Sequence, residues 1–271
     1  MASDHETARA QWLAQVKVMR RNERRLSKVF PRVYAAAIDR WVSTGSVAVP
    51  IEAQRDIAAT MVRMWRESIL TGGVFPMDQE KTAFAKLETK ADAETLFEQI
   101  MREFINRFGA MKVAQIIETT RDQIIRVIER GIADGLSVDE IAKAMRETVP
   151  ALSRTRAHII ARTEVHTAAM YASEEVAKTA IAPMNKRWIS VFDHRTRDFG
   201  EGDGVMDEFN HRVMNEVTVG PDELFSVPSK NGVFELMTGP GDPNGSAANV
   251  INCRCALVYR RVGRPWPKSG E

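Results

Sequence analysis

The feature that most constrains the fold is a change in sequence pattern near residue 183. Before it, apolar residues recur every three or four positions, as in Ile57, Met61, Trp65 and Ile69, which is the spacing of helices with one buried face. From Lys186 onward glycine and proline become dense, and short β-like runs appear at 186–192, 216–219, 233–237 and 252–261,. The pattern predicts an α+β fold, mainly α-helical over the N-terminal two thirds and followed by a small β-rich C-terminal unit.

Local signals predict where several helices begin and end. Val49-Pro50 opens one helix and Gly72-Gly73 ends it,. Gly135 stops another, and Ser137 with Glu140 forms a capping box that starts the next one,. That helix is expected to end near Thr148, before Val149-Pro150. Ser153 is expected to cap a separate long helix that ends near Pro183.

Charge is concentrated at the two ends of the chain. Lys and Arg number 38 against 36 Asp and Glu, so the overall charge indicates no partner. Residues 1–45 are nonetheless net +5 and residues 251–271 net +4. One predicted helix carries seven cations opposed only by Glu23: Lys17, Arg20, Arg21, Arg24, Arg25, Lys28 and Arg32. Such a face attracts DNA phosphates without sequence preference; it could equally be a solvated face or meet an acidic protein.

Cysteine content and hydropathy indicate the cellular compartment in which the chain is expected. Two cysteines, Cys253 and Cys255, cannot build a disulfide framework,. On one strand their Cα atoms would lie roughly 6.5 Å apart, which is poor geometry for a bridge. The N-terminus MASDHETARAQW is polar and no run reaches the ~18 apolar residues of a membrane span,. We expect a soluble, intracellular protein with reduced thiols and no membrane contact.

The same cysteines are candidate metal ligands. Two thiolates on one strand face, with one or two of the imidazoles of His166, His194 and His211, could complete a tetrahedral zinc site,. The alternative is a pair of small buried thiols in the strand core. A metal-assisted hydrolase would add Asp193 to Cys253, Cys255 and His211.

Charged groups near residues 162 and 193 are candidates for structural pairing. Glu164 and His166 are two positions apart on one helix, which points them in opposite directions and disfavours joint catalysis. We expect Glu164, next to Arg162, to bond Arg195, Arg197 or Arg254 and so fix the long helix to the β-rich unit. The Asp193–Arg197 run could bind phosphate through its arginines or close on itself as an Asx-type turn.

No P-loop, dinucleotide-binding fingerprint, nucleophile elbow or HExxH motif is present,. Residues 137–145 resemble the first helix of a helix-turn-helix reader, but the following connection, 147–152, is long and contains Pro150,. A sequence-specific regulator is therefore disfavoured.

Taken in order, several segments between Ile116 and Leu257 resemble the phage minor head, or head morphogenesis, proteins, a family that includes the F protein of phage Mu. The segments are the helix with Gly131, the GLSVDEIAKAM run, residues 156–165, Trp188 ahead of Asp193-x-Arg195-Thr196-Arg197, residues 240–243, and Ile251-Asn252-Cys253-Arg254-Cys255. One departure is Gly200, where the family commonly has a histidine. Either His211 takes its place after a small insertion, or the histidine is lost.

The resemblance implies a non-enzymatic virion component. Such a protein is present in the host cytoplasm during assembly and then lies inside the head near the portal vertex, in multiple copies. Its expected partners are the portal protein, the packaged double-stranded DNA and the major capsid protein. It would act in head morphogenesis and in DNA packaging or ejection. Residues 1–110 would form a helical, basic part that docks on the portal or capsid, residues 111–260 the minor-head-like domain, and residues 261–271 a flexible tail. No cofactor is expected apart from a structural zinc.

Overall fold

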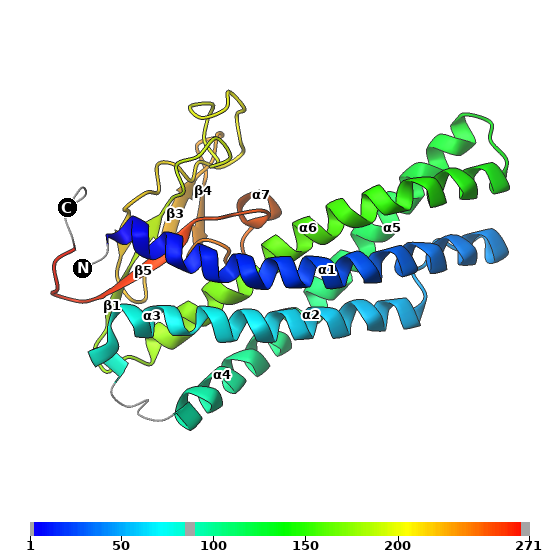
Figure 1. The fold of residues 1–271 in the computed structure, drawn as a ribbon. Helices are drawn as coiled ribbons and strands as arrows, with labels where there is room; N and C mark the ends of the chain where they lie inside the picture. Colours follow the sequence, from blue (N-terminus) through cyan, green and yellow to red (C-terminus); the bar gives the residue numbers. More distant parts are fainter. Residues whose placement is uncertain (1–2, 85–89, 267–271) are drawn as a thin grey trace. The chain divides into compact units, whose positions relative to one another are not determined.

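The computed structural model describes residues 3–84 and 90–266 and has the α+β fold that the sequence predicts (Figure 1). The chain divides into two compact units built from interleaved segments. The first comprises Met1–Val18, Trp65–Phe104 and Arg162–Glu271, and the second comprises Met19–Met64 and Ile105–Ala161. Three helices, α1 (Asp4–Thr44), α2 (Ile51–Gly72) and α6 (Val138–Lys178), contribute to both units, so the division does not follow the sequential boundary expected at residue 110.

The second unit is helical. Its segments of α1, α2 and α6 pack with α5 (Ala110–Ala133) around buried side chains that include Phe30, Tyr34 and Met61. Arg156 crosses from α6 to α5, where it donates to the Ile116 carbonyl at 2.8 Å and to Thr120 Oγ1 at 3.2 Å. These bonds tie α5 to α6 within the unit.

The predicted capping box at the start of α6 is confirmed. Ser137 N–H and Oγ–H donate to Glu140 Oε2 at 2.8 and 2.7 Å, and Glu140 N–H donates to Ser137 Oγ. Gly135 has φ +74°, and Leu136 N–H donates back to the Gly131 carbonyl. The positive φ explains why glycine ends α5 here.

The predicted break at Pro150 is wrong, because the 41-residue helix α6 runs through it without interruption. Proline removes one helical hydrogen bond and usually kinks or ends a helix. Here Met145, Val149, Ser153 and Ala157 are all buried at four-residue spacing on both sides of the proline. Packing of this stripe holds the helix together, and a second helix of a helix-turn-helix motif is therefore absent at this position.

The first unit contains further helices and both sheets. After α2 come α3 (Val74–Gln79), a 3-10 turn (Lys81–Phe84) and α4 (Lys90–Phe104). Where a stop was predicted near Gly109, a π-helical turn over Ile105–Gly109 joins α4 to α5. Trp65, Phe104 and Tyr171 form a chain of tilted and edge-to-face rings between α2, α4 and α6.

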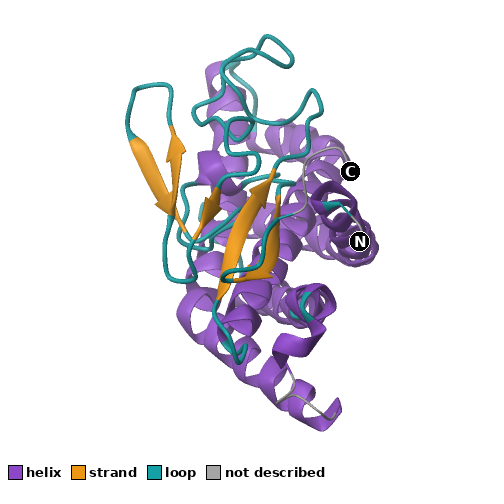
Figure 2. Cartoon of the chain, turned by 90° about the vertical axis from the view of Figure 1, so that its left-hand side faces the viewer, coloured by secondary structure: helices purple, strands orange, loops and turns teal. Residues whose placement is uncertain are grey.

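Figure 2 shows the two antiparallel sheets, which lie in the first unit. The larger has the order β2-β1-β5, with β1 Met184–Ile189, β2 Thr218–Val219 and β5 Ala256–Arg261; Trp188 of β1 pairs with Leu257 of β5. The smaller pairs β3 (Phe225–Pro228) with β4 (Phe234–Met237). Strand β3 and the short helix α7 (Ala247–Val250) were not predicted.

The C-terminal segment differs from the predicted flexible tail as far as it is described. Arg264 binds Glu80 at 2.8 and 2.9 Å, and Trp266 packs against a buried cluster that includes Ile189 and Val258. The guanidinium of Arg187 lies 4.0 Å from the centre of the Trp266 ring. Residues up to 266 are thus held by the first unit, and residues 267–271 lie outside the described part. Among the described helices, none has the length and apolarity needed to cross a bilayer.

Candidate functional site

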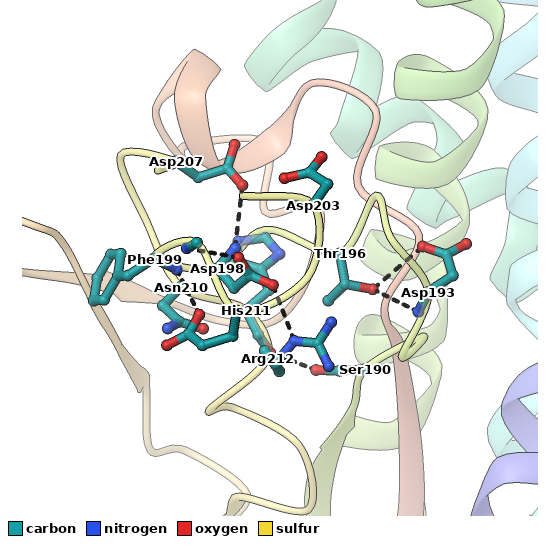
Figure 3. A network of polar contacts seen from close by, with 12 residues as sticks. Ser190, Asp193, Thr196, Asp198, Phe199, Asp203, Asp207, Asn210, His211 and Arg212 are labelled. Atoms are coloured by element: carbon teal, nitrogen blue, oxygen red, sulfur yellow. Dashed lines mark hydrogen bonds and ion pairs between the residues drawn. The ribbon is translucent and has the colours of Figure 1, made fainter. Parts of the chain in front are cut away.

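Polar and sulfur-containing side chains gather where the loop after β1 meets the segment that leads into β5. The loop, residues 190–217, joins β1 to β2, and residues 251–255 precede β5. Cys253 and Cys255 therefore lie before the strand and not on it, which corrects the prediction of a strand from residue 252. Figure 3 shows the loop folded back on itself around His211.

Three potential metal ligands converge in this region. One ligand atom each from His211, Cys253 and Cys255 lies within 4.8 Å of the others. The Sγ atoms of Cys253 and Cys255 each lie 3.7 Å from His211 Nδ1. The three side chains are buried, with exposed fractions of 1% to 4%. Of the histidines named as candidates, His211 alone joins the two cysteines in the described part of the chain.

A hydrogen-bonded chain orients the His211 ring. Nε2 lies 2.6 Å from Asn249 Oδ1, and Asn249 Nδ2 donates to Glu235 Oε2, also at 2.6 Å. Because the amide nitrogen donates to the carboxylate, the amide oxygen faces the imidazole as an acceptor. Nε2 therefore carries the proton, and the Nδ1 lone pair faces the two sulfur atoms. No sequence signal pointed to Asn249 or Glu235.

The two thiols differ in acidity. A hydrogen bond from Cys253 lowers the pKa of Cys255 well below its usual range; burial opposes this, and His211 reinforces it. The same hydrogen bond, together with burial, raises the pKa of Cys253. Trp188 packs edge-on against His211, with ring centroids 5.2 Å apart. The cluster thus favours a thiolate at Cys255.

The Asp193 segment forms an Asx-type turn braced by an arginine. Asp193 Oδ1 accepts from Arg195 N–H at 2.9 Å, and both carboxylate oxygens bind the guanidinium of Arg254. Burial alone would raise the pKa of Asp193, but hydrogen bonds from Arg254 and the Arg195 amide outweigh it and lower the pKa. Arg195 is exposed, whereas Arg197 donates to the Ile251 carbonyl. The turn is thereby connected to the cysteine segment.

A second acidic residue organises the rest of the loop (Figure 3). Asp198 is buried, accepts from Gly200 N–H at 2.9 Å and pairs with Arg212 Nε at 3.0 Å. Its own N–H donates to Asp207 Oδ2 at 3.1 Å. Ser190 at the end of β1 donates to the His211 carbonyl at 2.5 Å. These bonds fix the loop backbone that carries His211.

Glu164 is buried in α6 and accepts a hydrogen bond from the indole N–H of Trp65 at 3.0 Å. Arg254 and Arg197, two of its expected partners, bind Asp193 and Ile251 as described above. Arg162 is half-buried on the same helix, and the neighbouring Thr163 Oγ1 accepts from Asn252 N–H at 3.1 Å. The hydrogen bond between Thr163 and Asn252 thus connects α6 to the segment before β5.

The other candidate histidines lie apart from the cluster. His166 is buried, with Nδ1 3.0 Å from Gln15 Oε1, and burial lowers its pKa to about 4. His194 is exposed beside Arg195.

The predicted basic face is largely exposed. In the second unit Arg20, Arg21, Arg24, Lys28 and Arg32 are exposed on α1. Arg25 is half-buried and donates to Asn22 Oδ1 at 2.8 Å. Lys17, also exposed, belongs to the first unit.

Comparisons with known proteins agree with the sequence resemblance. A family model described as Phage Mu protein F like protein matches residues 122–258, half of the chain. The uncharacterized protein YqbB of Bacillus subtilis (strain 168) is 27% identical over 191 residues, covering 69% of this chain and 58% of that protein. The chain thus spans less than two thirds of that relative's length, and no solved structure matches. On the family match, the chain belongs to the phage Mu protein F like family, a family of phage head proteins.

Proposed function

We propose that this chain is a minor head protein of a tailed bacteriophage that lies inside the head near the portal vertex. There it would act in head morphogenesis and in DNA packaging or ejection through contacts with the portal protein and the packaged DNA, with the major capsid protein as a further partner. The family match carries the proposal. The basic face of α1 supports the contact with DNA.

The exposed cations of α1 have the spacing of one helical stripe. Arg20, Arg21, Arg24, Lys28 and Arg32 are separated by three or four residues or are adjacent, so they share one side of the helix. At 1.5 Å per residue the stripe is about 18 Å long, the length of about five phosphate steps along one DNA strand. We call these five residues the basic stripe. Four of its cations, Arg20, Arg21, Arg24 and Lys28, border a shallow surface hollow that Glu23, Arg25 and Ser27 also line.

Two acidic residues, Glu23 and Asp56, lie beside the stripe. Glu23 faces His158 at 3.3 Å, and Arg32 meets Asp56 at 3.8 Å with both side chains more than half exposed. An exposed pair at that distance contributes little and leaves the arginine available to a phosphate. The stripe therefore favours a polyanion as its partner. An acidic face of a portal subunit is the other surface of matching charge.

Neither of the other two function classes has comparable support. A helix-turn-helix regulator needs a second helix, and the continuous α6 removes it. A hydrolase needs a substrate to reach its metal, whereas His211, Cys253 and Cys255 are buried. Asp193, which the hydrolase would use, is paired with Arg254.

Quantitative mass spectrometry of purified, nuclease-treated phage particles tests the location. We expect a few to a few tens of copies of the chain per particle. Its absence from particles, with the protein left in the lysate, would refute a virion role. Crosslinking within the same particles should join the chain to the portal; crosslinks to tail proteins alone would contradict the proposed placement.

Salt-dependent DNA binding tests the basic stripe. The variant Arg20→Gln/Arg24→Gln/Lys28→Gln should bind duplex DNA more weakly. The slope of log K against log salt should become shallower by about 2.7, at about 0.9 for each lost phosphate contact. A matched control, Arg126→Gln/Arg130→Gln/Lys143→Gln, removes the same charge from exposed positions on α5 and α6 of the same unit. An equal loss of slope in both variants would show a nonspecific effect of net charge and refute the stripe as the contact.

A further inference from the structure

We propose that Cys253, Cys255 and His211 bind one soft divalent cation of the zinc class, and that this metal fastens the loop after β1 to the segment that leads into β5. The proposal concerns the folding of the isolated chain. It stands or falls independently of the role in the phage head.

The separations of the ligand atoms fit a tetrahedral metal. Zn–S bonds of about 2.3 Å and a Zn–N bond of about 2.0–2.1 Å at tetrahedral angles place sulfur and nitrogen roughly 3.6 Å apart. Both Sγ–Nδ1 distances in the structure are 3.7 Å. A cation between the three atoms thus needs little movement of the backbone or of the rotamers. Two thiolates and one imidazole also form a donor set that soft metals prefer over Mg²⁺ or Ca²⁺.

The surroundings of His211 are those of a metal-binding imidazole. Metal-ligating histidines almost always donate their other ring N–H to an acceptor, which fixes the tautomer and raises the basicity of the ligand nitrogen. Here Nε2–H donates to Asn249 Oδ1, and the Asn249 amide nitrogen in turn donates to the Glu235 carboxylate. The Nδ1 lone pair is thereby left for the cation. Two short hydrogen bonds of 2.6 Å maintain this orientation of the buried ring.

An unpartnered buried donor points to negative charge at the sulfurs. The indole N–H of Trp188 is fully buried, and no acceptor in the described part of the chain is in hydrogen-bonding position to it. Leaving such a donor unpaired costs stability. The ring packs edge-on against His211, which places it beside the cluster. A metal-bound thiolate keeps lone pairs that can receive this N–H.

A metal-free cluster is the competing interpretation. One imidazole nitrogen accepts one proton, so in that state one thiol donates to Nδ1 and the other donates to a sulfur atom. Cys253 then acts as the donor to Cys255, and the cluster is a satisfied pair of buried thiols. Metal content separates the two interpretations.

The protein supplies three ligands. Within the described residues no further His, Cys, Asp or Glu joins the group. A water molecule or another small ligand would complete a tetrahedral set. The Ser190 hydroxyl lies 3.9 Å from Cys255 Sγ and is engaged with the His211 carbonyl. Because the ligands are buried and link two distant segments, the metal would act structurally.

The first experiment measures metal in the full-length chain purified without an affinity-tag histidine run and without chelator. Elemental analysis should give about one zinc ion per chain. After unfolding with chelator and refolding with Co²⁺ and reductant, the protein should show thiolate-to-cobalt charge-transfer absorption and the d–d bands of a tetrahedral site. Zinc added to the refolded apoprotein should raise the unfolding temperature.

Matched variants locate the site. Cys253→Ser and Cys255→Ser should each remove the cobalt charge-transfer signal in part and lower zinc affinity at least tenfold, and His211→Gln should do the same. His194→Gln, at an exposed histidine of the same loop, should keep one zinc per chain. Wild-type protein that is folded by circular dichroism but takes up neither zinc nor cobalt from micromolar solution would overturn the proposal and leave the hydrogen-bonded thiol pair. This deciding measurement uses the folded wild-type protein, so it remains valid even if a variant fails to fold.

Discussion

Replacing Gly72 with alanine tests whether backbone packing or helix propensity decides stability at the end of α2. Gly72 is the last residue of the helix and is not among the residues with positive φ. Propensity alone therefore predicts that alanine stabilises the protein by up to about 1 kcal/mol. The structure predicts the opposite sign. A Cβ atom at this position would lie 2.1 Å from the Ala169 carbonyl oxygen and 2.5 Å from Ala169 Cα.

The magnitude follows from how far α2 and α6 would have to separate. A normal carbon–oxygen contact begins near 3.4 Å, so relief requires a movement of about 1.3 Å, estimated from the packing limits of well-ordered interiors. The obstructing atoms belong to the backbone of α6, so no side-chain rotation can provide it. Overpacking of this kind costs about 3 kcal/mol at the upper end of its usual range. After subtracting the propensity gain, we expect a net loss of about 2 kcal/mol and a fall in the unfolding temperature of roughly 4–8 °C.

Thermal and urea unfolding followed by far-ultraviolet circular dichroism measure the effect. Ala59→Gly, at an exposed position of the same helix, calibrates propensity alone and should lose about 1 kcal/mol. If Gly72→Ala is instead stabilised by about the amount that Ala59→Gly loses, the close approach of α2 to Ala169 does not govern stability and the reasoning fails.

Three further predictions concern buried and capping groups. Glu164→Ala leaves the Trp65 indole N–H without its acceptor and should lower the free energy of unfolding in urea by about 1–3 kcal/mol. Glu164→Gln keeps an acceptor oxygen and should lower it less. Equal losses in the two variants would contradict this account. Burial lowers the pKa of His166 to about 4. Because the unfolded chain then takes up a proton at a higher pH than the folded one, about 3 kcal/mol of the free energy of unfolding is present above pH 6.5 and is lost as the pH falls toward 4. In His166→Asn the slope of stability against pH should flatten over that window, and an unchanged slope would rule His166 out. Ser137→Ala removes the capping box of α6 and should lower stability by about 1 kcal/mol in the same assay, whereas Ser43→Ala, exposed in α1, should have little effect.

Local chemistry was sufficient to predict the α+β fold, the start of α6 and the ends of α2. The capping box of Ser137 and Glu140 and the left-handed Gly135 depend on neighbours a few residues away, so they can be read in the sequence. The same kind of reasoning failed at Pro150. There, burial of side chains on both sides of the proline outweighs its local preference, and that burial is a property of the packed unit.

The candidate site shows the same division. The sequence identified Cys253, Cys255 and His211 as ligand types, because only certain side chains carry sulfur or imidazole nitrogen. It also offered His166 and His194 as candidate ligands beside His211. The tertiary structure brings His211 to the two sulfurs, which lie 42 and 44 residues further along the sequence, and leaves His166 against Gln15. Asn249, Glu235 and Trp188 join the cluster through contacts that no local pattern encodes.

What the sequence determined by itself was the fold class, the capping box that starts α6, the chemistry of the candidate side chains and the family to which the chain belongs, because periodicity, capping and motif order are local properties of the chain. The tertiary structure decided the partners. Asp193 binds Arg254 and Glu164 accepts from Trp65, because a charged or polar group buried on folding binds whichever complementary group the packing places within reach.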